Sequence, residues 1–267
     1  GVYNTTLLVT SNNGCSNQAT LAVTVYDLPV ASFTQVNACD NEPIVMTSTA
    51  TSPAGGFNAY YWDYDVNNVV DYTGNPASYV FPNDGFKTVR HIVEDLHGCR
   101  DTVEQQITVY ALPHANFTST SVCEDATTAF TNTSSINPVD NDNVTTYAWS
   151  FGNGNTSNQQ NPTHAYGTEN VYNAKLVITT NYGCKDSISH PVEVYPLPDV
   201  SFTPTDVCLN FVTQFQDQTT VSNAHTTNSK VAWAWDFADG TTSTLQNPTH
   251  TYGADGTYNS ILTVTTN

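Results

Sequence analysis

An alternating acidic stretch, Asp63-x-Asp65-x-Asn67 followed by Asp71, has residue types and spacing suited to metal binding. Oxygen ligands at alternate positions are what a hard cation such as Ca²⁺ takes from a loop. The stretch departs from an EF-hand loop, because Asn68 stands where that loop has glycine and the bidentate glutamate is missing. Two interpretations stay open: a calcium site at these four residues, or a turn capped by its own Asx side chains. No other cofactor is required.

Histidines and aspartates recur along the chain without the consistency that a catalytic site needs. His164 and His250 occupy equivalent positions in two copies of a repeat, but the first copy has no histidine there. Asp63 and Asp236 match each other, yet Ser150 stands at that position in the copy between them. A catalytic pair is not expected to disappear from one copy while the surrounding scaffold persists. We therefore predict that this chain is not an enzyme.

The elements that position these residues are short β-strands, repeated along the chain. Val231, Trp233 and Trp235 alternate with small or polar residues, which is the period of a half-buried strand. The tryptophan recurs as Trp62, Trp149 and Trp235, which are 87 and 86 residues apart (149 − 62 and 235 − 149). A period of that length is typical of a small sandwich domain. The fold class predicted is all-β, with tandem immunoglobulin-like β-sandwich domains in an extended array.

Each repeat opens with a Tyr-x-Leu-Pro junction, at Tyr26, Tyr110 and Tyr195. Roughly seven short strands follow each junction, which is the number in an immunoglobulin-like sandwich. The predicted domains are the last two strands of a truncated repeat at 1–26, complete domains at 27–110 and 111–195, and a domain lacking its final strand at 196–267. We expect the two ends to be cuts through a continuous array. The alternative is that the leading hairpin of one molecule completes the trailing domain of another.

The run Trp-Asp-Phe-Ala-Asp-Gly at 235–240, with Asn-Pro-Thr-His-Thr-Tyr at 247–252, resembles the polycystic kidney disease (PKD) domain, whose hallmark is Trp-Asp-Phe-Gly-Asp-Gly. Ala238 replaces the hallmark glycine, and Ser150 and Asn153 depart from it in the preceding copy. The Leu-Pro opening and the Gly-Cys turn are similar to repeats of large secreted or surface proteins of Bacteroidota. The resemblance implies an immunoglobulin-like sandwich used as a spacer, stalk, adhesin or accessory module, without catalysis.

The six cysteines form two repeat-equivalent sets, Cys15, Cys99, Cys184 and Cys39, Cys123, Cys208. None lies in a Cys-x-x-Cys pair, so disulfides in an oxidising compartment are expected rather than zinc. In an immunoglobulin-like topology the exit-end cysteine of one domain meets the Gly-Cys turn of the next. We therefore predict a Cys39–Cys184 disulfide between two domains. Sequence neighbours such as Cys99 and Cys123 would lie too far apart in a linear array to bond.

The composition excludes several classes of partner. The 267 residues contain 6 Lys and Arg against 24 Asp and Glu, which gives a net charge of −18. A chain with so few cations should repel nucleic acid and anionic membranes. No apolar run approaches a membrane-spanning length, so no membrane insertion is expected. Together with the cysteines, these features predict an extracellular or cell-surface protein.

Two short motifs follow the Gly-Cys turns in the same register, Asp101-Thr102-Val103 and Asp186-Ser187-Ile188. They look like the Asp-Ser/Thr-apolar acceptor of O-glycosylation in Bacteroidota. This makes Thr102 and Ser187 candidate glycosylation sites. An ordinary strand start is the alternative.

The function predicted from these features is a non-catalytic structural or adhesive segment of a long extracellular protein, such as a stalk, fibre or adhesin. Its expected partners are neighbouring repeats and a surface polysaccharide or glycoprotein. The alternative is a set of carbohydrate-binding accessory modules of a secreted hydrolase. Sugars would then stack on aromatic residues beside the tryptophan strand, namely Tyr60, Tyr61, Tyr147 and Trp233. Core packing is the competing use of these four side chains.

Overall fold

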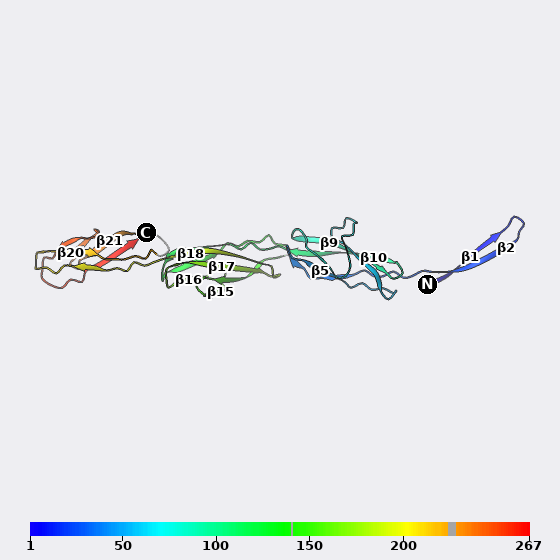
Figure 1. The fold of residues 1–267 in the computed structure, drawn as a ribbon, viewed down its shortest axis with the longest axis horizontal. Helices are drawn as coiled ribbons and strands as arrows, with labels where there is room; N and C mark the ends of the chain where they lie inside the picture. The colour runs from blue at the N-terminus through cyan, green and yellow to red at the C-terminus, as the bar shows by residue number, and fades with distance from the viewer. Residues whose placement is uncertain (140, 224–227) are drawn as a thin grey trace. The chain divides into compact units, whose positions relative to one another are not determined.

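The computed structural model describes residues 1–139, 141–223 and 228–267, and the regular elements in these ranges are β-strands (Figure 1). Within them, no helix has the length and apolar character that a membrane span needs. The chain divides into two compact units. One comprises residues 1–114, 135–145 and 178–186, and the other comprises residues 115–134, 146–177 and 187–267. The first unit therefore includes the predicted domain at 27–110 (domain 1) and one end of the domain at 111–195 (domain 2).

Domain 1 is a sandwich of a five-stranded sheet, in the order β4-β10-β9-β6-β7, and a three-stranded sheet, in the order β3-β5-β8. Its strands are β3 (Phe33–Gln35), β4 (Ala38–Cys39), β5 (Ile44–Ser48), β6 (Phe57–Asp63), β7 (Tyr72–Thr73), β8 (Ala77–Tyr79), β9 (Gly85–Asp95) and β10 (Arg100–Tyr110). This is one strand more than the roughly seven expected. The two-residue strands β4 and β7 are too short to show an alternating pattern in the sequence.

Domain 2 repeats the same two sheets, in the orders β12-β18-β17-β14-β15 and β11-β13-β16. Its strands are β11 (Phe117–Ser119), β12 (Val122–Cys123), β13 (Thr127–Asn132), β14 (Val144–Ser150), β15 (Thr156–Ser157), β16 (Thr163–Ala165), β17 (Asn170–Thr180) and β18 (Lys185–Tyr195). The equivalent strand orders show that the sequence repeat is a structural repeat.

The last domain, residues 196–267 (domain 3), has sheets in the orders β19-β20-β23 and β22-β21-β24. Its strands are β19 (Phe202–Pro204), β20 (Val212–Asp217), β21 (Lys230–Asp236), β22 (Thr242–Ser243), β23 (Thr249–Thr251) and β24 (Ile261–Thr266). Among the described residues, β24 is the edge strand of this second sheet. The equivalent strand of domain 2, β17, pairs with β18 on that side. Residues 1–26 form a separate hairpin of β1 (Val2–Thr10) and β2 (Ser16–Thr24), whose residues are all exposed.

The repeated tryptophan anchors the core of each sandwich. Trp62, Trp149 and Trp235 are all at most 2% exposed. In each domain the indole N–H donates to a backbone carbonyl of the following loop, at 2.8, 2.9 and 2.8 Å respectively. The ring thus buries a large apolar surface while its polar atom stays hydrogen-bonded. The pattern read from the sequence therefore identified the core residue correctly.

The asparagine of each Asn-Pro segment extends the hydrogen bonding of the three-stranded sheet of its domain. The side-chain oxygens of Asn75, Asn161 and Asn247 accept backbone N–H groups of β5, β13 and β20, at 2.9, 2.8 and 2.9 Å respectively. A side-chain amide therefore replaces a ladder bond where proline interrupts the strand.

Domain 1 has a histidine at a buried core position where domain 2 has a leucine. His91 is fully buried and stacks on Trp62 with ring centroids 3.9 Å apart. Its ring nitrogens contact the Tyr61 carbonyl at 3.1 Å and the Ser48 hydroxyl at 2.8 Å. Leu176 occupies the equivalent position in domain 2. Burial lowers the pKa of His91 below its ordinary value of 6.5.

This histidine predicts a pH-dependent stability for domain 1. Burial keeps the pKa of His91 in the folded domain below that of the unfolded chain, which takes up a proton below about pH 6.5. The free energy of unfolding should therefore fall as the pH is lowered below about 6.5, by up to about 1.4 kcal/mol per pH unit. Urea unfolding or hydrogen exchange of domain 1 across this range measures the slope. His91→Leu, which copies domain 2, should flatten it, and an equal slope in that variant would contradict the assignment.

Candidate functional site

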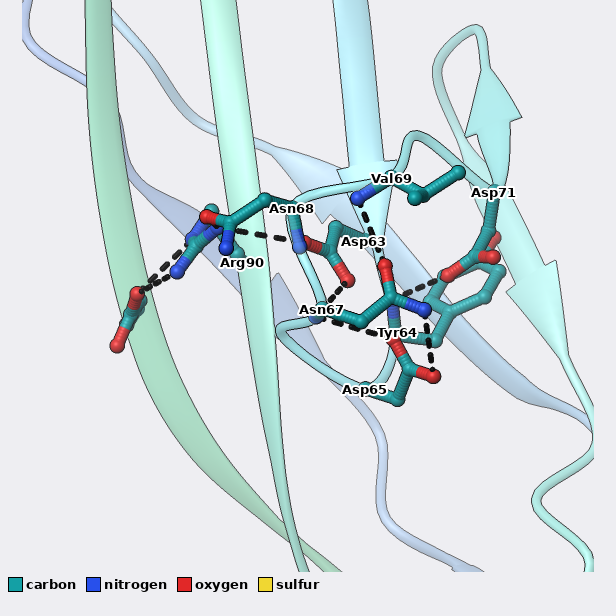
Figure 2. Close-up of polar contacts among 9 residues, drawn as sticks. Asp63, Tyr64, Asp65, Asn67, Asn68, Val69, Asp71 and Arg90 are labelled. Carbon is teal, nitrogen blue, oxygen red and sulfur yellow. Dashed lines mark hydrogen bonds and ion pairs between the residues drawn. The ribbon is translucent and has the colours of Figure 1, made fainter.

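The acidic stretch folds into a tight loop after β6, and it brings the predicted calcium ligands together (Figure 2). One carboxylate oxygen from each of Asp63, Asp65 and Asp71 lies within 4.8 Å of the other two. Asn67 lies in the same loop, but its side-chain oxygen accepts the Val69 N–H at 2.7 Å. The three carboxylates are thus close enough to approach a single cation.

The same oxygens already serve the loop's own backbone. Asp63 accepts the N–H groups of Asn67 and Asn68 at 3.2 and 2.9 Å, and Asp65 accepts the Asn67 N–H at 3.2 Å. Asp71 accepts the Tyr64 N–H at 2.7 Å. These contacts form the Asx-capped turn that was the competing interpretation. The carboxylates have further lone pairs that a cation could use, and the calcium site stays a prediction.

The guanidinium group of Arg90 also contacts this loop. Arg90 on β9 lies 3.3 Å from Asp63 and 2.7 Å from Glu104, and it also donates to the Asn68 side chain (Figure 2). The Asp63 side chain is 2% exposed, so its charge is buried and paired. Sequence reasoning missed Arg90, because its partner is set by the register of β6 against β9, in which Asp63 lies opposite Arg90.

Calcium binding at this loop is open to a direct test. If Ca²⁺ binds here, it should raise the melting temperature of domain 1 by mass action. Asp65→Ala should abolish that shift, because it removes one of the three carboxylates. Since Asp65 is exposed and has no buried partner to lose, the variant should still fold. Asp186→Ala, outside the loop, is the control. Calorimetry with and without Ca²⁺ measures the shift, and a shift unchanged in Asp65→Ala would refute the site.

The histidines considered as catalytic candidates lie in aromatic stacks. His164 stacks on Phe151 and His250 on Phe237, each with ring centroids 4.4 Å apart. His250 Nε2 also lies 2.7 Å from Asp239, a contact that was not predicted from the sequence. The pKa of Asp239 is lowered to about 2, mainly by the hydrogen bond from the Thr241 hydroxyl and then by the contact with His250.

This His-Asp contact does not have the geometry of a proton relay. Asp239 and the Thr241 hydroxyl both approach the same ring nitrogen of His250, at 2.7 and 3.5 Å. A Ser-His-Asp relay uses both ring nitrogens, one toward the nucleophile and one toward the carboxylate. In domain 2 the equivalent contact is from Asn153 to His164, at 3.0 Å, with no carboxylate. These contacts serve to hold the turn.

The junction between domains 1 and 2 contains the disulfide expected from the sequence. Cys39 on β4 is bonded to Cys184 in the turn between β17 and β18, with Cα atoms 5.6 Å apart. Beside it, Tyr110 and Tyr182 stack with ring centroids 3.8 Å apart. Cys39, Cys184 and Tyr110 form a buried apolar cluster of their own. All four residues belong to the first compact unit.

The candidate glycosylation residues are accessible in the structure. Thr102 on β10 and Ser187 on β18 are both exposed. The Asp101 carboxylate beside Thr102 accepts the Ala31 N–H at 2.8 Å, so it has a structural task at the domain entrance. That contact supports an ordinary strand start, and glycosylation at both residues stays a prediction.

The aromatic residues considered for sugar binding are half-buried, and Tyr61 and Trp233 make polar contacts within their own domains. The Tyr61 hydroxyl donates to Glu94 at 3.2 Å, and the Arg100 guanidinium lies 5.3 Å from the Tyr61 ring centroid. The Trp233 indole donates to Asp217 at 2.9 Å. Tyr60 and Tyr147 are half-buried as well. These contacts favour the packing interpretation for Tyr61 and Trp233, and sugar binding stays a prediction.

Comparison with known proteins identifies the sequence motif. A PKD domain family model matches residues 110–195 and 196–267. A microbial collagenase of Vibrio alginolyticus is 25% identical over 169 residues, which are 56% of this chain and 20% of that protein. Collagenase ColA of Bacillus cereus is 36% identical over 62 residues, which are 23% of this chain and 6% of that protein. The matches thus span a fifth or less of these curated relatives.

A solved structure shows the same kind of similarity. The PKD1 domain from the Vibrio cholerae metalloprotease PrtV is 31% identical, with a TM-score of 0.28, and covers 31% of this chain and 96% of that one. The PKD1 domain of Vibrio anguillarum Epp is 26% identical, with a TM-score of 0.28, and covers 32% and 98%. Each of these solved domains thus covers about a third of this chain.

Proposed function

The chain belongs to the PKD domain family, and from that premise we propose that it is a series of non-catalytic accessory domains in an extracellular protein. In this role the sandwiches set the spacing and orientation of other modules of the same polypeptide. Similarity to PKD domains of bacterial collagenases and a metalloprotease supports an accessory role and points to an extracellular location. His and Asp residues of one repeat are replaced at the equivalent positions of another, which supports the absence of catalysis.

The observation that carries this proposal is the Cys39–Cys184 disulfide, which joins one sandwich covalently to the next. A spacer has to limit the freedom of its domains, since flexible linkers place attached modules poorly. The disulfide and the stacked Tyr110–Tyr182 rings together restrict rotation at this junction.

The spacer role predicts a mechanical effect of removing the disulfide. In Cys39→Ser/Cys184→Ser, residues of domain 1 and domain 2 should reorient independently, while each domain keeps its fold. Residual dipolar couplings fitted separately to the two domains measure this. One common alignment tensor is expected in the parent chain and two different tensors in the variant. Cys123→Ser/Cys208→Ser, at cysteines that are free in the structure, is the matched control. A common tensor in both variants would mean that the disulfide does not orient the domains.

A second candidate is the stalk, fibre or adhesin of a large surface protein of the Bacteroidota type. The observation that favours it is the repetition of one sandwich along the chain, which suits binding through many weak contacts. Soluble protein applied to triple-helical collagen and to a glycan array distinguishes the two. Collagen binding alone would favour the accessory role beside a protease. Binding to surface polysaccharide would favour the adhesive role or a carbohydrate-binding accessory role.

A further inference from the structure

The turn after the tryptophan strand of domain 2 contains an asparagine directly before a glycine, Asn153-Gly154, and both residues are exposed. An asparagine can react with its own backbone, because the nitrogen of the next residue can attack the side-chain carbon and close a succinimide ring. Glycine favours this reaction, since it has no side chain to shield its nitrogen. The geometry of the turn then decides whether Asn153 is reactive.

The backbone nitrogen of Gly154 is free to act as the nucleophile. Among the described residues, its N–H donates to no acceptor, and the turn is closed around it by the Phe151 N–H, which donates to the Asn155 carbonyl at 3.0 Å. A Cβ built on Gly154 would meet no other atom within 4 Å, so the space beside it is open. At the other Asn-Gly pair of the sequence, by contrast, the Gly14 N–H donates to the Ser11 carbonyl at 2.9 Å.

The side-chain amide of Asn153 lies between two groups that can assist the reaction. Its oxygen accepts the Asn155 N–H at 3.2 Å, and its nitrogen donates to Nε2 of His164 on β16 at 3.0 Å. An N–H at the oxygen stabilises the negative charge that develops there when the carbonyl carbon is attacked. An imidazole beside the nitrogen can deliver the proton with which ammonia leaves.

Packing holds the His164 ring in the position that this role needs. The ring stacks on Phe151 with centroids 4.4 Å apart and meets the Tyr166 ring edge-on at 4.6 Å. Its strand, β16, is paired with β13, where His164 lies opposite Thr128. Burial lowers the pKa of His164 below its ordinary value of 6.5, which makes its charged form a stronger acid. A fixed proton donor thus faces an exposed turn.

Domain 3 contains the product of such a reaction as an encoded residue. Asp239 stands at the position of Asn153, and its carboxylate lies 2.7 Å from His250 Nε2. The His250 ring stacks on Phe237 with the same centroid distance, 4.4 Å, as the stack in domain 2. An aspartate at position 153 would therefore fit the turn and pair with His164.

We propose that Asn153-Gly154 is a self-modification site, at which His164 promotes deamidation of Asn153 to aspartate. The Gly154 nitrogen loses its proton to water and bonds to Asn153 Cγ, while charge moves to Oδ1, which the Asn155 N–H stabilises. The Cγ–Nδ2 bond breaks, and ammonia leaves with a proton from the His164 imidazolium, which water replaces. Water then opens the succinimide, at Cγ to give aspartate or at the backbone carbonyl to give isoaspartate. The net reaction consumes one water and releases one ammonia.

The test follows Asn153 in the full chain during incubation in neutral buffer at physiological temperature. Peptide mass spectrometry detects the exchange of the amide NH2 for OH, and electron-based fragmentation separates aspartate from isoaspartate. A synthetic peptide of residues 150–157 has the same turn sequence without His164, so it gives the unassisted rate. Asn153 should convert faster in the folded chain than in this peptide. Slower conversion in the folded chain would overturn the proposal.

His164→Phe tests the role of the imidazole, because it keeps an aromatic ring on Phe151 and removes the ring nitrogen. It should lower the rate at Asn153 by about a hundredfold, which is the lower end of what a positioned proton donor contributes. Hydrogen exchange of β14 and β16 checks that the variant folds. His250→Phe, the same change in domain 3, is the matched control and should leave the rate at Asn153 unchanged. An unchanged or higher rate in His164→Phe would contradict the proposal.

Asp239→Asn transfers the site to domain 3 and does not depend on the stability of the His164 variant. The new asparagine would precede Gly240, and the Thr241 N–H, which donates to Asp239 at 3.0 Å, takes the part of the Asn155 N–H. With His250 beside it, this asparagine should revert to aspartate faster than a peptide of residues 236–243 that has the same substitution. If it stays an asparagine while the peptide converts, the arrangement of turn and histidine does not promote deamidation and the proposal fails.

Discussion

Trp149→Ala is expected to lower the free energy of unfolding of domain 2 by about 3–5 kcal/mol. The ring is 2% exposed and packs edge-on against Phe117, with centroids 5.0 Å apart, and against Phe130 at 5.4 Å. Its removal leaves a cavity and also deprives the Gln159 carbonyl of its indole donor. Both losses act on the same small core.

Because several domains unfold in one chain, a single melting temperature does not measure this effect. Hydrogen exchange resolved by peptide reports each domain separately. Trp149→Phe is the control that keeps most of the apolar ring and loses the indole N–H, and its cost should be well below that of alanine. A loss below about 1 kcal/mol in Trp149→Ala would show that Trp149 is not the anchor of this core.

Arg90→Met is expected to destabilise domain 1 by up to about 3–5 kcal/mol. The change leaves the buried Asp63 carboxylate without its cation, 3.3 Å away in the parent. Because Arg90 is 17% exposed and Asp63 keeps two backbone donors, the effect should lie at the lower end of that range. Hydrogen exchange of β6 and β9 measures the loss.

Domain 2 provides the matched control for this ion pair. Its residues at the two positions are Ser150 and Lys175, so Asp63→Ser/Arg90→Lys transfers that pair into domain 1. The double variant should be more stable than Arg90→Met, since no carboxylate is left buried. If Arg90→Met were as stable as the parent, the Asp63 charge would be solvated by other groups and the pair would have no structural role.

The repeat pattern was sufficient to predict the sandwiches, their tryptophan anchors and the cysteine pair between domains. These features depend on alternation within a strand and on the order of strands, which are both legible in one sequence. The Asn-Pro segments were also recognisable, although the contacts of their asparagines with β5, β13 and β20 were not.

Contacts across strands could not be predicted. The pairing of Arg90 with Asp63 depends on the register of two strands that are 27 residues apart at this point. His91 looked like an ordinary strand residue, and only the folded core shows that it replaces a leucine. The predicted calcium ligands converge because the loop is short. The backbone N–H groups that donate to these carboxylates are oriented by φ values near +60° at Val66 and Asn68, which the sequence does not reveal. The predicted domain boundaries stay predictions, because the two compact units do not coincide with them.

The Cys39–Cys184 bond also determines which residues bear the load when the chain is pulled at its ends. The two cysteines are 145 residues apart in sequence, and the disulfide transmits the force directly from one to the other. The residues between them, which include most of both sandwiches, are then excluded from the loaded path. At about 3.4 Å per extended residue, the bond withholds roughly 500 Å of slack that would otherwise be released when these sandwiches rupture. Reduction of this one disulfide would thus allow the segment between Cys39 and Cys184 to unfold and extend under force.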